Sequence, residues 1–203
     1  MKENRKLLFT DILKKFSTFY WNIIDNLATN LENFADKYYK LSIGKRYQIE
    51  YIEFDINKKD KVLHIGSGSY PLTEITLATF IGSKIVGIDK KEKAVLKARK
   101  IVKRKNLNDN IKITIGNGIN YQVSEFDVII ISSCAIPMLE ILNHILKNCK
   151  GGCKIIIREL QISFKPLMSF MISKKIRPVK TIQHHPLPFF RPFGWISILI
   201  KKS

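Results

Sequence analysis

Two kinds of hydrophobic pattern alternate along the chain from residue 61 onward. Short runs rich in Val and Ile, which are typical of buried strands, lie at 61–65, 84–88, 111–115, 126–131 and 153–158. Between these runs, apolar residues recur at steps of three and four, as in amphipathic helices, over 72–80, 91–105 and 138–147. Strands that alternate with helices in this way predict a parallel sheet covered by helices on both faces.

The last part of the chain follows a different pattern. Strand-like runs lie at 179–183 and 195–201, and the segment between them, HHPLPFFRPFG, is rich in Pro and shows no helical pattern. A parallel crossover needs about a dozen residues and usually a helix, so we expect this pair to be antiparallel. The whole pattern predicts an α/β, Rossmann-like, doubly wound sheet of seven strands, mostly parallel, with an antiparallel C-terminal strand.

The N-terminal part is expected to be helical. No Gly or Pro lies between Leu7 and Leu41, and apolar residues recur there at helical spacing. A further helix is expected over 44–57. We therefore expect residues 1–57 to form an N-terminal helical cap and residues 58–203 to form the main domain. The apolar stripe leaves three roles open: packing on the main domain, a lid over the active site, or a surface that meets a partner or a membrane.

Charge is the least ordinary feature of the composition. The 203 residues suffice for one domain with a modest extension, but 35 Lys and Arg face 17 Asp and Glu, for a net charge of +18. This balance favours anionic partners, such as nucleic acid, phosphorylated or carboxylated molecules, or an acidic membrane surface. Many of the cations lie on the helix expected at 91–105, which forms either a solvated face or an RNA-binding surface. The sequence leaves the oligomeric state open, and a homodimer is one of the alternatives.

Cysteine usage and hydropathy bear on the cellular compartment. The three cysteines, Cys134, Cys149 and Cys153, form neither a CxxC motif nor a plausible disulfide framework, and no metal site is expected. Charged residues interrupt the first apolar run, unlike in a signal peptide. The most apolar window, 128–139, is too short to span a bilayer. These features predict a cytoplasmic protein.

The stretch HIGSGSYP carries the first sign of a ligand. Gly66 and Gly68 follow a strand and precede a helix, where glycines permit a tight turn and close approach of a ligand to the backbone. The dinucleotide fingerprint places a third glycine at the position of Pro71, which argues against NAD-type packing. Asp89 ends the second strand, where an acid can accept both ribose hydroxyls. These residues indicate a nucleotide-like ligand.

Polar residues after the third and fourth strands narrow the choice among nucleotide-like ligands. Asn117 follows the third strand, and Ser132 and Ser133 follow the fourth, at the edge where open α/β sheets bind ligands. Together with the glycine turn and the antiparallel ending, they resemble the class I S-adenosylmethionine-dependent methyltransferase fold over roughly residues 45–203. The resemblance implies the glycine motif at 66–68, the ribose acid at Asp89 and the adenine contact at Asn117. Many members carry an acid where this chain has His64, which we expect to be buried and hydrogen-bonded.

The resemblance implies S-adenosylmethionine as the cofactor and a set of residues that contact it. The expected cofactor-binding residues are Gly66, Ser67, Gly68, Pro71, Thr73, Asp89, Lys90, Asn117, Gly118, Ser132 and Ser133.

Two longer stretches carry a narrower resemblance. GSGSYPLTEITLA and EFDVIIISSCAIP are similar to the corresponding parts of nicotianamine synthases, which transfer the 3-amino-3-carboxypropyl group of S-adenosylmethionine. That family has a larger N-terminal helical domain. The first hypothesis is therefore methyl transfer to a small, anionic acceptor. The alternatives are aminocarboxypropyl transfer with release of methylthioadenosine, and a binding protein without turnover.

Three residues are the candidates for catalysis. Tyr70 lies in the glycine loop, where it contacts ligand or substrate or else acts as an aromatic plug. Glu159, at the end of the fifth strand, is the best acid for a substrate amine or for proton abstraction, unless it is a solvent-exposed strand end. His185, or its neighbour His184, can serve as a base near neutral pH. Methyl transfer itself needs alignment more than a dedicated catalytic motif.

Overall fold

The computed structural model describes residues 42–185 and 194–202. The N-terminal apolar stripe, most of the expected helical cap and most of the Pro-rich segment lie outside the described residues. The division into a cap over 1–57 and a domain over 58–203 therefore stays a prediction.

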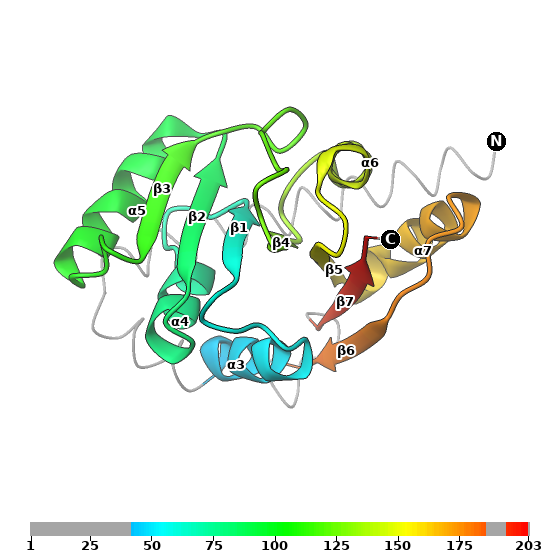
Figure 1. Ribbon diagram of the computed structural model, residues 1–203, viewed down its shortest axis with the longest axis horizontal. Helices are drawn as coiled ribbons and strands as arrows, with labels where there is room; N and C mark the ends of the chain where they lie inside the picture. The colour runs from blue at the N-terminus through cyan, green and yellow to red at the C-terminus, as the bar shows by residue number, and fades with distance from the viewer. Residues whose placement is uncertain (1–41, 186–193, 203) are drawn as a thin grey trace.

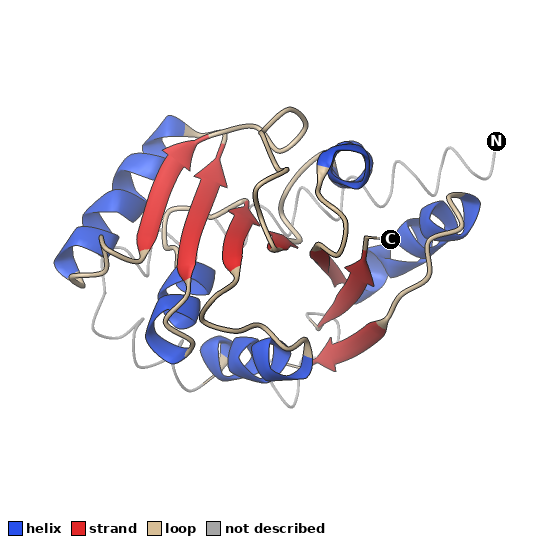
Figure 2. Cartoon of the chain, in the orientation of Figure 1, coloured by secondary structure: helices blue, strands red, loops and turns tan. Residues whose placement is uncertain are grey.

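A single twisted sheet forms the centre of the molecule (Figures 1 and 2). Its strand order is β3-β2-β1-β4-β5-β7-β6. The strands are β1 (Lys61–Ile65), β2 (Lys84–Asp89), β3 (Ile111–Ile115), β4 (Val128–Ile131), β5 (Lys154–Leu160), β6 (Lys180–His184) and β7 (Trp195–Lys201). The first five strands pair in parallel, and β7 pairs antiparallel with both β5 and β6. The predicted fold class is confirmed, including the antiparallel ending.

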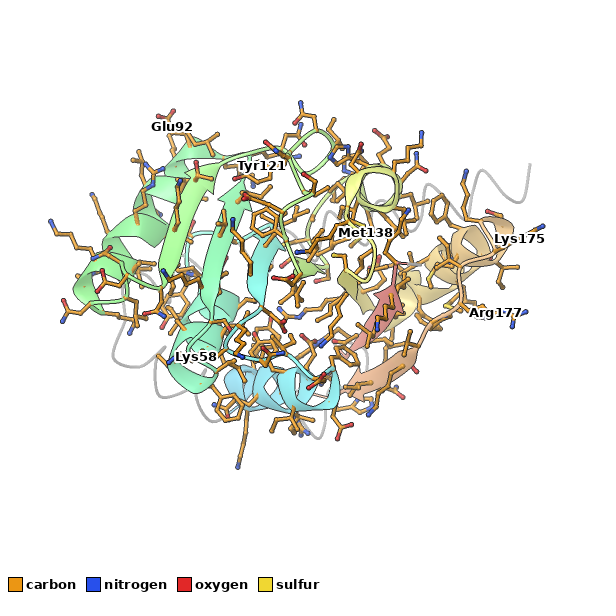
Figure 3. All side chains as sticks on the ribbon, in the orientation of Figure 1. Lys58, Glu92, Tyr121, Met138, Lys175 and Arg177 are labelled. Carbon is orange, nitrogen blue, oxygen red and sulfur yellow. The ribbon has the colours of Figure 1, made fainter. Side chains whose placement is uncertain are left out.

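Helices cover both faces of this sheet. The helices are α3 (Ile43–Glu53), α4 (Leu72–Phe80), α5 (Glu92–Arg104), α6 (Met138–Asn148) and α7 (Phe164–Ser173). One core cluster joins α3, α4 and α5 to the sheet, and another joins α6 and α7 to its opposite face. Because successive strand residues point to opposite faces, neighbours in β4 divide between these clusters: Ile130 belongs to the first and Ile129 to the second. Charged side chains such as Lys58, Lys175 and Arg177 lie at the outer surface (Figure 3).

Helix α7 was not predicted. It follows a short 3-10 helix at Gln161–Ser163 and packs Leu167 and Met171 against the second core cluster. Its signal is present in the sequence, since Phe164, Leu167, Met168 and Met171 recur at helical spacing. Pro166 obscures the pattern, although proline is tolerated in the first turn of a helix. The helix covers the face of β5 that would otherwise be exposed beyond α6.

Candidate functional site

The glycine turn after β1 lies at the point where the strand order reverses. β1 has β2 on one side and β4 on the other, and their carboxyl ends form the crevice where open α/β sheets bind ligands. Gly66 and Gly68 adopt φ values of 92° and 67°, which a side chain would strain. The amides of Gly66 and Ser67 donate to Ile88 O at 2.8 and 3.0 Å and fasten the turn to β2.

A cavity of about 490 Å³ opens beside this turn, at the ends of β1, β2 and β3. Asp89 lines it with a carboxylate whose oxygens accept from the amides of Gly68 and Lys91, at 3.0 and 2.9 Å. These bonds fix the carboxylate, and each oxygen keeps a lone pair for a ligand hydroxyl. Lysines form one rim of the cavity, at positions 90, 91, 93 and 97.

The loop after β3 forms the far wall of the same cavity. Asn117 Oδ1 accepts from the amide of Ile119 at 3.3 Å, which holds the side-chain amide in one orientation. A Cβ added to Gly118 would lie 2.7 Å from Ile65 Cγ2, so only glycine lets this loop pass so close to β1. The wall is therefore a tight backbone surface that presents one amide side chain.

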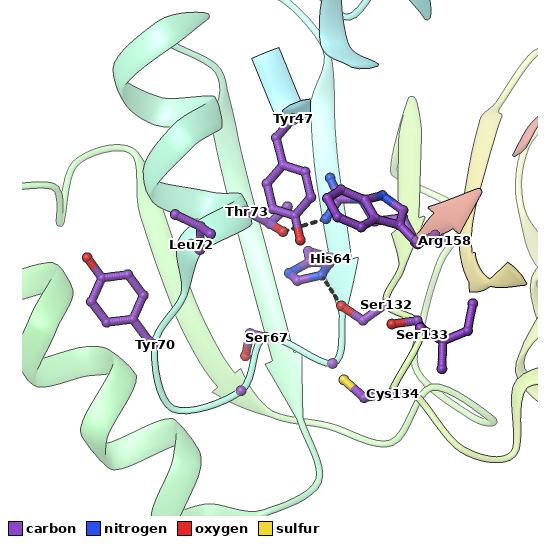
Figure 4. A pocket seen from close by; sticks show the side chains of 14 residues that line it. Tyr47, His64, Ser67, Tyr70, Leu72, Thr73, Ser132, Ser133, Cys134 and Arg158 are labelled. Carbon is purple, nitrogen blue, oxygen red and sulfur yellow. Dashed lines mark hydrogen bonds between the residues drawn. The ribbon is translucent and has the colours of Figure 1, made fainter. Parts of the chain in front are cut away.

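A second pocket, of about 90 Å³, lies on the other side of the glycine turn (Figure 4). It meets the large cavity at Gly66, Gly68 and Cys134, which line both. Its remaining lining residues are Tyr47, His64, Ser67, Tyr70, Leu72, Thr73, Ser132, Ser133, Arg158, Leu160 and Trp195. These residues come from α3, α4, three strands, the turn after β1 and the loop after β4.

A row of polar side chains reaches this small pocket from the interior. His64 is buried, and its Nδ1 lies 2.7 Å from Glu74 Oε1 while its Nε2 lies 2.8 Å from Ser132 Oγ. The expectation that His64 is buried and hydrogen-bonded is confirmed. Ser132 is half-buried at the pocket wall.

Arg158 and Glu50 form a buried ion pair behind the same pocket. The Arg158 guanidinium donates to both oxygens of Glu50, at 2.7 to 3.2 Å, and to Thr73 Oγ1 at 2.6 Å. It also stacks 3.6 Å from the ring centre of Tyr47. Burial by itself would lower the pKa of Arg158, but the Glu50 carboxylate, together with Tyr47 and Tyr51, raises it well above its usual value. Burial raises the pKa of Tyr51, which also contacts Arg158, well above its usual value.

The ion pair continues into the antiparallel strands. Ser197 of β7 donates to Glu50 Oε2, and His184 of β6 contacts Ser197 Oγ at 3.1 Å. His184 stacks on Trp195, with ring centres 4.8 Å apart. Burial lowers the pKa of His184 to about 4, so its imidazole is neutral at pH 7.

Comparison with known proteins assigns this arrangement to a family. The profile of the protein-L-isoaspartate(D-aspartate) O-methyltransferase family, PCMT, matches residues 42–174, about two thirds of the chain. The chain belongs to the PCMT family. A search of curated proteins found no significant match. In the described part of this PCMT-family chain, no helix is long and apolar enough to cross a membrane.

Solved structures share the fold of this PCMT-family chain. A mutant of MtNAS, a nicotianamine synthase, superposes with a TM-score of 0.70 at 18% identity, over 85% of this chain and 64% of that one. This chain thus spans less than two thirds of the length of MtNAS. A Methanococcus maripaludis protein described as an S-adenosylmethionine-dependent methyltransferase superposes with a TM-score of 0.69 at 18% identity, over 88% and 93%. An RNA methyltransferase from Salinibacter ruber, in complex with S-adenosylhomocysteine, gives 0.59 at 18% identity, over 79% and 92%.

These findings show a class I methyltransferase fold and S-adenosylmethionine as the cofactor. The residues present fit that cofactor. Positive-φ glycines leave the turn without side chains, and a Cβ on Gly66 would lie 3.1 Å from Ser132 Cβ. Ser67 Oγ is buried and has no hydrogen-bond partner in the described part of the chain, so a polar ligand atom can satisfy it.

Most of the residues expected at the cofactor line one of the two pockets of this PCMT-family protein. The large cavity is lined by Gly66, Gly68, Asp89, Lys90, Asn117 and Gly118. The small pocket is lined by Ser67, Thr73, Ser132 and Ser133, and also by the catalytic candidate Tyr70. Pro71 lines neither pocket and precedes the first residue of α4. Whether these residues contact the cofactor stays a prediction.

Two of the catalytic candidates lie away from both pockets. Glu159 is fully buried, so the alternative of a solvent-exposed strand end is wrong. It shares the strand face of Ile157, opposite Arg158, and one of its oxygens accepts from the amide of Leu160 at 3.0 Å. His185 is exposed at the end of β6 and lines neither pocket. Tyr70 is buried among Ile43 and other apolar residues while lining the small pocket.

Sequence reasoning missed the charged residues of the interior. Glu50, Glu74 and Arg158 are all almost fully buried and organise the small pocket. Arg158 carries a usable signal, because it interrupts the apolar run of β5, where a charge needs a buried partner. Glu74 similarly interrupts the apolar helix α4. The identity of their partners depends on contacts that are distant in sequence.

Proposed function

We propose that this chain transfers the methyl group of S-adenosylmethionine to a small acceptor molecule. The cofactor occupies the large cavity and the acceptor reaches the small pocket. The observation that carries this proposal is that the two pockets meet at Gly66, Gly68 and Cys134. A group transferred between them has only to cross the glycine turn at the end of β1.

The large cavity has the dimensions and chemistry for this cofactor. Its volume of about 490 Å³ falls within the usual range of small-molecule sites. Asp89, already oriented by two backbone amides, is positioned to accept the ribose hydroxyls, and Asn117 is positioned for an adenine edge. When bound, the cofactor supplies a carbon made electrophilic by the sulfonium, so that the protein must mainly align a nucleophile with the carbon–sulfur bond.

The small pocket favours a small polar acceptor. Its volume of about 90 Å³ suits a group of a few heavy atoms. Trp195 Nε1 is buried without a hydrogen-bond partner in the described part of the chain, so it can donate to such a group. An anionic portion of the acceptor is supported at the rim of the large cavity by Lys90, Lys91 and Lys93. The family profile names a protein carboxylate as the acceptor class. We propose small-molecule acceptors for this chain because the pocket has room for only a few heavy atoms.

The alternative is transfer of the 3-amino-3-carboxypropyl group. The likeness to MtNAS and the SYPLT sequence of the loop before α4 support it. Incubation with cofactor labelled separately on the methyl group and on the carboxypropyl arm distinguishes the two reactions. We expect methyl label in the product and release of S-adenosylhomocysteine. Label from the arm, with release of methylthioadenosine, would establish the alternative instead.

The cofactor assignment is tested by calorimetry on the full chain. Asp89→Ala should weaken S-adenosylmethionine binding about tenfold or more, because hydrogen bonds to a charged group contribute about 1.5–3 kcal/mol. Asp109→Ala, at an exposed position outside both pockets, is the matched control and should leave affinity unchanged. NAD(H) should bind far more weakly than S-adenosylmethionine. Equal affinity of the Asp89 variant and the wild type would contradict the proposed site.

A further inference from the structure

Glu74, His64 and Ser132 form a carboxylate–imidazole–hydroxyl row that no step of the proposed function yet uses. Each residue comes from a different element: Glu74 from α4, His64 from β1 and Ser132 from the end of β4. The contacts are 2.7 Å from Glu74 Oε1 to His64 Nδ1 and 2.8 Å from His64 Nε2 to Ser132 Oγ. This is the geometry by which a buried carboxylate orients a histidine that takes a proton from a hydroxyl.

The surroundings of Glu74 show that the fold makes room for this row. Glu74 is fully buried, and its second oxygen, Oε2, has no hydrogen-bond partner in the described part of the chain. Gly87 of β2 lies directly beneath it, where an added Cβ would stand 2.3 Å from Glu74 Oε1. At the other end, Ser132 lines the small pocket next to the glycine turn. The row thus leads from the interior to the pocket wall beside Gly66, and Figure 4 shows its pocket end, the contact of His64 with Ser132.

We propose that this row is a proton relay, and that the acceptor is therefore a neutral amine or hydroxyl that must lose a proton. The inference rests on the proposed function and names its acceptor class. A free carboxylate already carries a lone pair for attack and has no proton to lose. An alcohol must lose its proton as it attacks, and a neutral amine must lose one from the ammonium that its attack forms. The relay serves transfer of either the methyl or the carboxypropyl carbon, because both require the same proton to leave.

The proton path follows from the donor capacities of the three groups. An ionised Glu74 can only accept, so His64 carries its proton on Nδ1 and accepts at Nε2 from the Ser132 hydroxyl. As the acceptor's lone pair forms the new bond to carbon, the carbon–sulfur bond breaks with its electron pair on sulfur. The acceptor's proton passes to Ser132 Oγ while the Ser132 proton passes to His64 Nε2. Glu74 then stabilises the imidazolium, which makes it a positioning residue.

Other charged groups near the row are already engaged. Arg158 and Tyr47 line the same pocket, but the guanidinium is held by Glu50 and Thr73. Cys134 also lines the pocket. Glu74 is the carboxylate in contact with His64.

The tautomer of His64 provides a test that needs no acceptor. In ¹⁵N NMR of the full chain bound to S-adenosylmethionine near pH 7, Nδ1 should be the protonated nitrogen and Nε2 the unprotonated one. The Nδ1 proton should be shifted strongly downfield by the carboxylate, and this shift should disappear in Glu74→Gln but persist in Ser132→Ala. A proton found on Nε2 in the wild type would overturn the relay, because Nε2 would then donate to Ser132 rather than take its proton.

Turnover provides the second test, with a panel of small amines, alcohols and carboxylic acids as probe acceptors. His64→Gln and Glu74→Gln should each lower kcat for amines or alcohols about 100-fold or more, with cofactor affinity unchanged. His144→Gln, a hydrogen-bonded histidine of α6 outside both pockets, is the matched control. Turnover of carboxylates alone, unaffected by His64→Gln, would refute the relay but leave methyl transfer intact. Failure of the wild type to bind S-adenosylmethionine would refute the proposed function itself.

Discussion

The large cavity and the small pocket lie on either side of one glycine turn, yet they are formed by different kinds of chemical group. The large cavity is formed mainly by backbone at strand ends, with Asp89 held by the amide of Lys91, two residues away, and by the amide of Gly68 in the neighbouring glycine turn. The small pocket is formed by buried ionisable side chains, and its key contacts join Glu50 to Arg158 across 108 positions and His64 to Ser132 across 68. The first site depends on local chain conformation, and the second depends on the assembled core.

This difference predicts that substitutions of the buried charges at the small pocket lower the free energy of unfolding, whereas substitutions in the large cavity do not. The largest effect is expected for Arg158→Met, which leaves the Glu50 carboxylate buried without its partner. Removing one member of a buried pair typically costs about 3–5 kcal/mol. Urea denaturation should show that loss in the free energy of unfolding.

The same helix offers a control for this prediction. Glu53 of α3 pairs with Lys180 at the surface, where both side chains are about half exposed. Glu53→Gln should cost no more than about 1 kcal/mol. The double variant Glu50→Leu with Arg158→Met should recover part of the loss, because it leaves no unpaired charge. Equal costs for the buried and surface variants would contradict the coupling of the small pocket to stability.

The second prediction concerns the pH dependence of stability. Burial lowers the pKa of His184 to about 4, while an unfolded chain has the ordinary value of about 6.5. Between these values only the unfolded state binds the proton, so stability is full above about pH 6.5 and falls as the pH decreases towards 4. The difference corresponds to about 3 kcal/mol at the low end.

The measurement compares the wild type with His184→Gln across this pH range. Glu50, Arg158, Arg46 and His185 also act on the imidazole, so the slope with pH is the relevant quantity rather than the stability at one pH. The variant should lose less stability than the wild type as the pH decreases. Parallel slopes would show that His184 is accessible to protons in the folded state.

The contrast between the two regions also explains what the sequence could reveal. Local patterns indicate both the strands and the large cavity. The β-branched runs indicate the strands, including the antiparallel pair at the C-terminal end. The glycines at 66 and 68, which adopt positive φ, and an acid at a strand end indicate the large cavity. His64 was expected to be buried because a polar residue inside an apolar strand needs partners. Its actual partners, Glu74 and Ser132, were not identifiable, because nothing local specifies which helix residue faces which strand.

The small pocket shows the limit of local patterns more sharply. Arg158 and Glu159 are adjacent charges in β5, so the signal that a charge in this apolar run needs a buried partner applies to both and does not distinguish which of them faces the pocket. Strand alternation sends them to opposite faces, but which face carries the site depends on where α3 packs. Helix α7 covers the Glu159 face, and its absence from the predicted elements made that residue seem available at a strand end.

The third prediction separates two glycines by their surroundings. Gly87→Ala should destabilise the fold by about 1–3 kcal/mol, because the added methyl group collides with Glu74 Oε1 and Ile113 Cδ1. It should also disturb the downfield Nδ1 proton signal of His64. Gly151→Ala is the control, since no atom lies within 4 Å of its added Cβ. If both substitutions were equally tolerated, Glu74 would have to be free to move, and the row could not be rigid.

The smallest effect is expected at the lysine rim of the large cavity. S-adenosylmethionine carries a net positive charge, so Lys93, which lines the rim and is exposed, should repel it weakly. Lys93→Gln should therefore tighten binding by about twofold at most at an ionic strength near 0.01 M, and the gain should vanish near 1 M because salt screens exposed charges. Lys100→Gln, an exposed position of the same helix outside the cavity, is the control. A large loss of affinity in Lys93→Gln alone would mean that Lys93 pairs with the carboxylate of S-adenosylmethionine rather than repelling its net charge. The large cavity would then be a charge-based site, unlike the backbone-built site that the glycine turn and Asp89 form.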